Sequence, residues 1–261
     1  LASALYYGPS TSTGDGVIMA TADGINAATR LMEYGKRYPN GVEVSKGIAK
    51  STIAGNIAGW TMSAILVNAE GERVVNEKAS NRTILEAELA QTGSELFLLM
   101  DSETFNVWKT KLAAAGLTEE TIDGYVAANG TTTPVFAHGD TLEEVAAGVN
   151  GENLVKTVER YNGFVAAGND EDFGRSADYM TMAIGDGPYY LVEQKPRFAT
   201  TMGGLVVNAS LQVENTDGDV IPGLYAAGEV VGGVMGDDSP SGANNGWALT
   251  AGKLAAEAIA E

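Results

Sequence analysis

Apolar residues recur along the chain with two spacings, one typical of helices and one typical of strands. The helical spacing predicts helices over residues 17–32, 80–90, 105–115, 153–167 and 247–260. Short runs rich in β-branched and other apolar residues predict strands at 64–68, 73–75, 96–100, 205–207, 211–213 and 223–227. Strands alternate with helices near both ends, which favours an α/β arrangement there and an α+β arrangement between them.

Glycine and capping residues indicate how several of these elements are joined. A Gly-containing break at 69–71 separates two predicted strands and indicates a hairpin. The capping box of Thr141 and Glu144 predicts a further short helix. The segment 223–227 combines small, apolar and aromatic residues, so we expect it to be a buried strand.

Composition sets the class of protein. The chain has 261 residues, of which 44% are hydrophobic and 19% charged, a balance typical of a globular protein. Because domains cluster near roughly 100–150 residues, we expect one large domain or two modest ones. The absence of cysteine excludes disulfides, thiolate metal sites and cysteine nucleophiles. The single histidine, His138, falls in a predicted loop and provides no basis for a metal site.

The charge balance limits the expected partners. Acidic residues outnumber basic ones by 34 to 16, and the formal net charge is −18. This charge repels polyanions, so neither nucleic acid nor an anionic membrane surface is an expected partner. No apolar run reaches the length of about 18 residues that a membrane-spanning helix needs, and no basic and apolar leader opens the sequence. The sequence is compatible with both a cytoplasmic and an exported protein.

A Gly-rich stretch, residues 228–246, lies between the predicted strand at 223–227 and the helix at 247–260. The first amides of a helix are unpaired and carry roughly half a positive charge, so a strand, a Gly-rich loop and a helix start together favour cofactor binding. Glu229, at the end of the strand, can accept hydrogen bonds from ribityl or ribose hydroxyls. A loop that only reverses the chain direction remains the alternative.

A set of short motifs extends over almost the whole chain. They are Thr13-Gly-Asp-Gly16, Gly71-Glu-Arg-Val-Val-Asn-Glu77, Thr141-Leu-Glu-Glu144, Arg160-Tyr-Asn162, Asp170-Glu-Asp-Phe-Gly-Arg175, Gly187-Pro-Tyr-Tyr190, Thr201-Met-Gly-Gly-Leu205, Ile221-Pro-Gly-Leu-Tyr-Ala-Ala-Gly-Glu-Val230 and Gly252-Lys-Leu-Ala-Ala256. In sequence and order they resemble the C-terminal half of the fumarate reductase flavoprotein family, which also includes urocanate reductases and ketosteroid dehydrogenases.

The resemblance implies an FAD-dependent oxidoreductase with a partial Rossmann-like FAD-binding domain and an inserted α+β capping domain. Residues 1–56 and 200–261 would belong to the FAD-binding domain, and residues 57–199 would form the cap over a small-molecule substrate. The family's Gly-x-Gly-x-x-Gly unit for the ADP half of FAD does not occur in the sequence. We therefore expect a fragment that holds FAD weakly or not at all by itself, with the missing FAD-domain segment or an electron-donor domain as partner.

The resemblance also implies which residues contact flavin and substrate. The flavin contacts would be Gly203, Gly204, Ala227, Gly228, Glu229, Gly242, Ala243, Asn244 and Asn245. The substrate contacts would be Phe105, Tyr189, Arg197, Thr200 and Ser239, and the catalytic residues Glu77, Arg82, Tyr190 and Thr201. Glu77 and Arg82 follow the hairpin as the family's proton-relay acid and base do, with a spacing one residue longer. A surface ion pair is the alternative for them, and core packing for the two tyrosines.

Three features that bind or protonate fumarate in the family are absent at the corresponding positions. By ungapped comparison, the family's His-His pair becomes Ala199-Thr200, its terminal Arg becomes Ser239 and its proton-donating Arg becomes Phe105. A dicarboxylate needs two cationic groups to hold it, so we expect a conjugated enoate or enone other than fumarate. Arg197 would bind a single carboxylate or pair with surface acids. A ketosteroid-type dehydrogenase, suggested by Val234-Met-Gly236, and a non-catalytic binding module remain alternatives.

Overall fold

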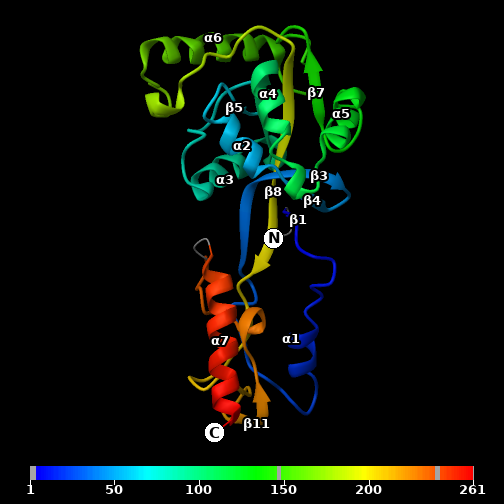
Figure 1. The fold of residues 1–261 in the computed structure, drawn as a ribbon, viewed down its shortest axis with the longest axis vertical. Helices are drawn as coiled ribbons and strands as arrows, with labels where there is room; N and C mark the ends of the chain where they lie inside the picture. The colour runs from blue at the N-terminus through cyan, green and yellow to red at the C-terminus, as the bar shows by residue number, and fades with distance from the viewer. Residues whose placement is uncertain (1–3, 146–147, 239–241, 261) are drawn as a thin grey trace. The chain divides into compact units, whose positions relative to one another are not determined.

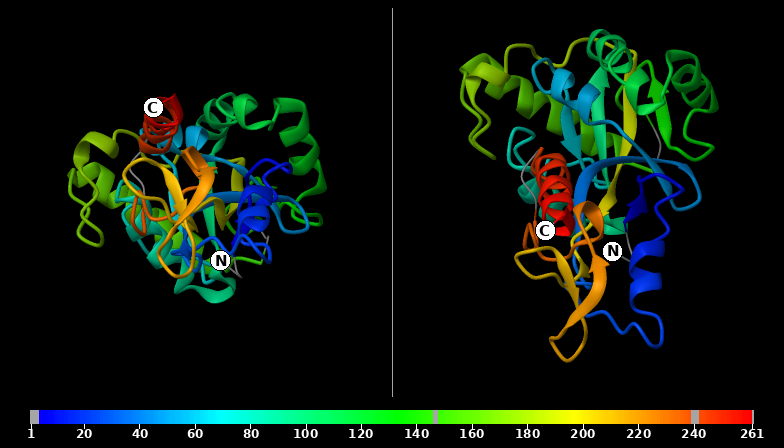
Figure 2. Two further views of the ribbon diagram at one scale, coloured as in Figure 1. Left: turned by 90° about the horizontal axis from the view of Figure 1, so that it is seen from below. Right: turned by 60° about the horizontal axis from the view of Figure 1, so that its bottom comes forward.

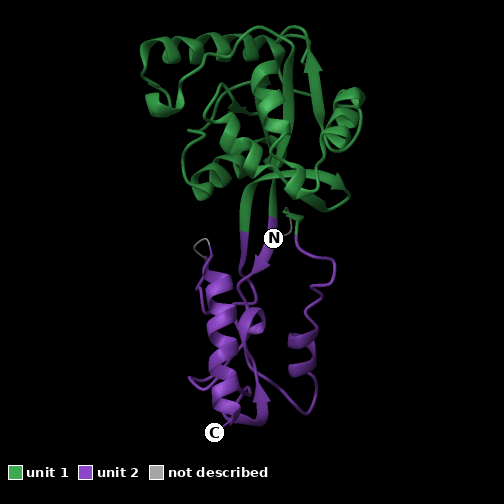
Figure 3. Ribbon diagram, viewed as in Figure 1, with its two compact units in different colours: residues 1–7, 37–197 green, residues 8–36, 198–261 purple. Residues whose placement is uncertain are grey.

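The computed structural model describes residues 4–145, 148–238 and 242–260. The chain divides into two compact units (Figure 3), unit 1 with residues 1–7 and 37–197 and unit 2 with residues 8–36 and 198–261. Two long strands, β3 (Gly35–Ser45) and β8 (Tyr189–Thr201), contribute residues to both units. The boundary between the units therefore differs from the one predicted after residue 56, because residues 37–51 supply strands to the sheet of unit 1.

Unit 1 is built on a sheet with the strand order β1-β4-β3-β8-β6-β5, in which β7 also pairs with β8 (Figure 1). Its other strands are β1 (Leu5–Tyr6), β4 (Ile48–Ser51), β5 (Ile65–Val67), β6 (Leu96–Asp101) and β7 (Phe136–Gly139). Its helices are α2 (Ile53–Gly59), α3 (Asn81–Leu89), α4 (Ser102–Lys109), α5 (Glu119–Ala128) and α6 (Gly151–Ala167), with 3-10 turns at η1 (Thr92–Ser94), η2 (Ala113–Ala115) and η3 (Ala177–Tyr179).

Strand β6 is buried along its whole length and divides its side chains between two hydrophobic cores. Leu98 and Met100 belong to a core that includes residues of α3, α4 and α5. Phe97 and Leu99 belong to a second core that includes the buried face of α6. Because successive strand side chains point to opposite faces, a continuous apolar run is the sequence that a strand covered on both faces requires.

Unit 2 contains α1 (Asp15–Ala20), α7 (Ala243–Ala260), the 3-10 turn η4 (Gly228–Val230) and two short antiparallel sheets. One sheet pairs β2 (Thr29–Arg30) with β9 (Gly204–Leu205), and the other pairs β10 (Gln212–Glu214) with β11 (Val220–Tyr225). Figures 1 and 2 show α7 lying along the β10–β11 hairpin. Ala251 and Ala255 of α7 form a small core with Leu211, which fixes the helix against this hairpin.

The mixed α/β fold class predicted from the sequence is confirmed, and several elements lie where the hydrophobic pattern places them. The predictions at 80–90, 96–100 and 153–167 correspond to α3, β6 and α6. The predicted hairpin is present as an antiparallel bridge between Val67 and Arg73. The helix expected over 17–32 ends at Ala20, because the chain turns at Gly24, with φ of 89°, and then enters β2.

Three further predictions differ from the structure. The Glu144 carboxylate accepts a hydrogen bond from the Thr141 amide at 3.3 Å, but residues 142–144 form only a turn. His138 lies in β7 rather than in a loop, because β7 pairs with β8. Of the segment 223–227, expected as a buried strand, only residues 223–225 lie in β11, where Gly223 is exposed and Leu224 and Tyr225 are half-buried, because β11 pairs only with β10 among the described strands; Ala226, just after the strand, is buried.

Candidate functional site

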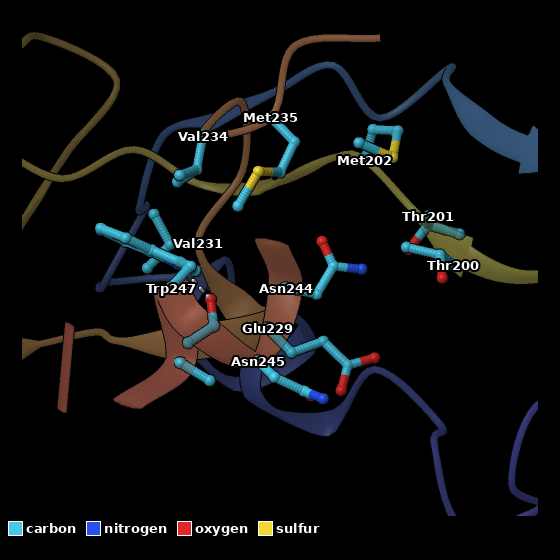
Figure 4. A pocket seen from close by; sticks show the side chains of 12 residues that line it. Thr200, Thr201, Met202, Glu229, Val231, Val234, Met235, Asn244, Asn245 and Trp247 are labelled. Carbon is cyan, nitrogen blue, oxygen red and sulfur yellow. Dashed lines mark hydrogen bonds between the residues drawn. The ribbon is translucent and has the colours of Figure 1, made fainter. Parts of the chain in front are cut away.

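A cavity of about 240 Å³ in unit 2 is lined by several of the predicted flavin and substrate contacts. Glu229 comes from η4, Asn244 and Asn245 from the first turn of α7, and Thr200 and Thr201 from the end of β8. Figure 4 shows the side chains of Glu229, Asn244 and Asn245 extending toward the same side. The apolar part of the wall consists of Met202, Val231, Val234, Met235, Trp247 and Ala248.

The loop beside this cavity is held by backbone geometry. Gly228 has a φ of 74°, which residues with a side chain rarely adopt. Its carbonyl accepts hydrogen bonds from Trp247 Nε1 at 3.0 Å and from the Val231 amide at 3.2 Å. These bonds join η4 to α7. The indole therefore fixes the first turns of α7 next to η4.

Two predicted flavin contacts, Gly203 and Gly204, serve backbone packing and do not line the cavity. A Cβ atom at Gly204 would lie 2.3 Å from the Val230 carbonyl oxygen, and one at Gly203 would lie 2.6 Å from the Cα of Met32. Both distances are too short for any side chain, so glycine permits β9 to approach these segments. The other predicted contacts that do not line the cavity are Ala227, Gly242 and Ala243.

The polar groups of the cavity fit part of a flavin nucleotide. The Glu229 carboxylate can accept hydrogen bonds from hydroxyls, and the carboxamides of Asn244 and Asn245 can both donate and accept. Enclosed small-molecule pockets measure roughly 300–1,000 Å³. At about 240 Å³, the cavity holds only part of a dinucleotide. Glu229 is the single charged residue in the described lining, so the cavity offers no cation to a carboxylate.

In unit 1, Glu77 belongs to a buried network of two arginines and two acids. Its carboxylate accepts hydrogen bonds from Arg73 at 2.8 Å, from Arg175 at 3.1 Å and from the Leu66 amide at 3.1 Å. Arg73 also binds Asp170 at 2.9 Å. Burial opposes ionisation of Arg73, but its bonds to Glu77 and Asp170 raise its pKa above the ordinary value. The network ties the hairpin to the segment after α6.

Arg82, the other predicted proton-relay residue, does not join this network. Its side chain is 80% exposed and pairs with Glu86 one turn further along α3 at 3.1 Å. The structure therefore does not bring Glu77 and Arg82 together as a pair. Sequence reasoning missed Arg73 and Arg175 as the partners of Glu77. Arg73 and Arg175 lie in the motifs 71–77 and 170–175, but the motifs do not indicate which acid each arginine pairs with.

The predicted aromatic contacts lie in the packed interior of unit 1. The rings of Phe105 and Tyr190 stack with centroids 3.9 Å apart and an interplanar angle of 5°. Phe105 is buried and Tyr190 half-buried against the same core, while Tyr189 packs against the core that includes α6. Burial, together with the nearby Asp186 and Asp101, raises the pKa of Tyr189. Core packing, the alternative considered for both tyrosines, therefore describes their positions.

The remaining predicted substrate contacts have different surroundings. Thr200 lines the cavity of unit 2. Arg197 is buried in β8 of unit 1, beside Asn40. Ser239 lies outside the described residues. Within the described ranges, no group of three or more metal-binding side chains is found, and none of the described helices combines the length and apolarity needed to cross a membrane.

Comparisons with known proteins agree with the motif resemblance. A protein-family model described as FAD binding domain matches residues 2–245. The chain is 34% identical over 253 residues to a fumarate reductase (cytochrome) of Shewanella frigidimarina, which covers 96% of this chain and 40% of the relative. It is 33% identical over 227 residues to a urocanate reductase of Eggerthella lenta, which covers 86% of this chain and 35% of the relative.

A solved structure gives a similar result. The crystal structure of 3-ketosteroid delta1-dehydrogenase from Sterolibacterium denitrificans matches with a TM-score of 0.73 at 25% identity, covering 99% of this chain and 49% of that one. The chain thus spans less than half the length of each of these relatives. The resemblance to the fumarate reductase flavoproteins, inferred from the motifs, is confirmed.

Proposed function

Because the chain belongs to the FAD binding domain family, we propose that it is part of an FAD-dependent oxidoreductase that transfers hydride between flavin and a conjugated enoate or enone other than fumarate. One observation carries the proposal: Glu229, Asn244 and Asn245 present polar side chains to one cavity beside a Gly-rich turn. FAD, when bound, supplies the hydride donor and acceptor, a chemistry that protein side chains lack.

The residues of the cavity have distinct roles in this proposal. Glu229 accepts hydrogen bonds from ribityl hydroxyls, and the carboxamides of Asn244 and Asn245 orient the polar edge of the ring system. The hydroxyls of Thr200 and Thr201, from the other side of the lining, orient a substrate oxygen. Thr201 is thus the one predicted catalytic residue that lines the cavity. Glu77 and Tyr190 are held in unit 1 by ion pairs and ring stacking.

The charge of the cavity supports a substrate other than fumarate. A dicarboxylate requires two cationic partners, and the described lining carries only the negative charge of Glu229. Lys36 of unit 2 pairs with Asp238 at 2.5 Å, which neutralises a cation of the same unit. The urocanate reductase relative also fits an acceptor other than fumarate.

Helix α7 supports the proposal that a further polypeptide segment is a partner. Leu249 is 79% exposed and Ile259 61% exposed on this helix. Large exposed apolar patches mark interaction sites on soluble proteins. We propose that an FAD-domain segment or an electron-donor domain covers this helix in the complete enzyme, and that the complete assembly retains FAD more tightly than this chain does.

A ketosteroid-type dehydrogenase is the second candidate. The solved steroid dehydrogenase matches almost the whole chain, and the apolar side chain of Met235 lines the cavity, as a neutral substrate would favour. A binding module without its own flavin is the third. The enoate or enone oxidoreductase and the ketosteroid-type dehydrogenase both require flavin at the cavity of unit 2, whereas the binding module does not.

A chemical-shift titration of the isotope-labelled chain tests the cofactor assignment. Riboflavin, FMN and FAD are added in turn, and backbone and carboxamide signals are followed by NMR. We expect concentration-dependent shifts centred on Glu229, Asn244 and Asn245 for all three ligands, since riboflavin already carries the ribityl hydroxyls. Shifts centred elsewhere would contradict the assignment, whereas no shift with any of the three ligands would favour the binding module.

A further inference from the structure

Arg197 is a buried cation of unit 1 that has no acidic partner among the described residues. The residue is 6% exposed, and it forms no ion pair with any carboxylate in the described part of the chain. Three other cations of unit 1 contrast with it: Arg73, Arg175 and Lys195 each lie within 3.3 Å of a carboxylate oxygen. Because burying a charge without a counter-ion is costly, the isolation of Arg197 requires an explanation.

Asn40 holds the guanidinium but cannot neutralise it. Its Oδ1 accepts hydrogen bonds from Arg197 Nε at 2.9 Å and from Nη2 at 2.6 Å. These bonds fix the orientation of the amide, because a flipped amide would turn its own N–H groups toward the cation. Nδ2 therefore points away from the guanidinium, where it is buried and has no hydrogen-bond partner in the described part of the chain. A buried donor without an acceptor is unfavourable.

Two tyrosine rings lie against the guanidinium of Arg197. The guanidinium carbon lies 4.4 Å from the ring centroid of Tyr7 and 4.8 Å from that of Tyr38. Burial lowers the pKa of Arg197, and the two tyrosines oppose that effect. Arginine nevertheless stays charged in proteins. Nη1 donates no hydrogen bond to a described residue. Arg197 thus carries a positive charge, and neither its Nη1 nor Asn40 Nδ2 has an acceptor within the described ranges.

We propose that Arg197 and Asn40 form an anion site that binds the carboxylate of a small organic acid, with Arg197 Nη1 and Asn40 Nδ2 as the donors. A planar guanidinium edge matches a planar carboxylate. The single charge of Arg197 balances one carboxylate, whereas a phosphate dianion would need a second cation. The site is defined within unit 1 alone. Its assignment to the substrate rests on the proposed function, and it then favours an enoate over a neutral enone such as a ketosteroid.

The test uses the 261-residue chain without flavin, so that its outcome is independent of the cofactor assignment. Acrylate, acetate and inorganic phosphate are titrated, with sodium chloride at matched ionic strength as the reference. The thermal unfolding midpoint and the side-chain NMR signal of Arg197 Nε are recorded. We expect acrylate and acetate to raise the midpoint saturably and to shift the Nε signal, because a ligand that binds only the folded state stabilises it. Chloride should do neither.

The variant Asn40→Asp separates a binding role from a structural one. It places a carboxylate against the guanidinium and removes the orphaned amide, so the fold should persist or gain stability while carboxylate affinity falls about tenfold or more. Asn208→Asp, which changes an Asn in unit 2, serves as the matched control and should bind as the parent chain does. Unchanged affinity in Asn40→Asp, or no saturable effect of carboxylates on the parent, would overturn the proposal. If phosphate bound and the carboxylates did not, the proposed ligand class, a monocarboxylate, would be wrong.

Discussion

Arg175 and Glu77, 98 positions apart in the sequence, form an ion pair in which neither side chain is exposed and Nη1 lies 3.1 Å from Oε2. Arg175 also donates to the carbonyl oxygens of Trp60 at 2.7 Å and Ala64 at 2.9 Å. The guanidinium therefore connects the segment after α6 to the loop before β5. This arrangement makes Glu77 a structural counter-ion within unit 1.

Replacing Glu77 with Gln is expected to lower the free energy of unfolding by about 3–5 kcal/mol, because it leaves the buried charges of Arg73 and Arg175 without their shared partner. Urea denaturation followed by circular dichroism measures the change. The control is Arg82→Ala, which alters an exposed side chain and should change stability by no more than about 0.5 kcal/mol. Equal effects of both variants would contradict the assignment of Glu77 to the buried network.

The difference between these two residues shows what the sequence can predict. The Gly-containing break at 69–71 and the apolar pattern predicted the hairpin and α3, because both depend on neighbours within a few residues. The partner of Glu77 depends on how the segment after α6 returns to the hairpin, which no local spacing encodes. The helix expected over 17–32 fails for the same reason: pairing of β2 with β9, whose partners are far apart in sequence, overrides local periodicity.

Glu229→Ala is expected to weaken flavin binding about tenfold or more, because a hydrogen bond to a charged acceptor contributes roughly 1.5–3 kcal/mol. A flavin fluorescence titration of this chain measures the affinity. In any longer protein that contains the chain, the ratio of bound flavin to protein after purification measures the same effect. Glu257→Ala removes the same charge from α7, where Glu257 pairs with Lys253 on the exposed surface. That variant should bind flavin normally. An equal loss in both would indicate a general charge effect rather than a contact at the cavity.

Gly204→Ala should destabilise unit 2 by about 1–3 kcal/mol, the typical cost of overpacking. A Cβ atom there would lie 2.3 Å from the Val230 carbonyl oxygen and 2.7 Å from the Gly232 amide nitrogen. Gly252→Ala is the matched control, because nothing lies within 4 Å of a Cβ at that helical position, and it should stabilise α7 by about 0.5–1 kcal/mol. Thermal unfolding of both variants distinguishes the two effects. Stabilisation by both would contradict the close backbone approach.

The candidate site was predictable to the extent that it is continuous in sequence. The family resemblance implied Gly228, Glu229, Asn244 and Asn245 as flavin contacts, all within the Gly-rich stretch 228–246, and the structure brings them to one cavity. Their flavin role itself stays a prediction. Asn40 carried no sequence signal, because its significance depends on a hydrogen bond to a residue 157 positions away and on an amide nitrogen for which the described residues provide no acceptor.

Glu88 on α3 carries a buried carboxyl group whose replacement should change the stability of the chain. It is fully buried, and neither carboxylate oxygen has a hydrogen-bond partner among the described residues. Burial, with a smaller contribution from the charge of Glu95, raises the pKa of Glu88 well above its ordinary value. Glu88→Met should therefore stabilise the chain at neutral pH by about 1–3 kcal/mol, because it removes an unsatisfied polar group and keeps a side chain of similar length.

The pH dependence follows from the direction of this shift. A carboxyl whose pKa is raised on folding destabilises the folded state most fully above its folded-state pKa. That penalty falls as the pH drops through the folded-state pKa and is gone below the unfolded value of about 4.3. The stability gap between Glu88→Met and the parent chain should therefore narrow as the solution is acidified, measured by urea denaturation at several pH values. Glu86→Met, on the exposed face of the same helix, should show no comparable difference in stability from the parent chain. A stability difference for Glu88→Met that does not change with pH would contradict a raised pKa of the Glu88 carboxyl.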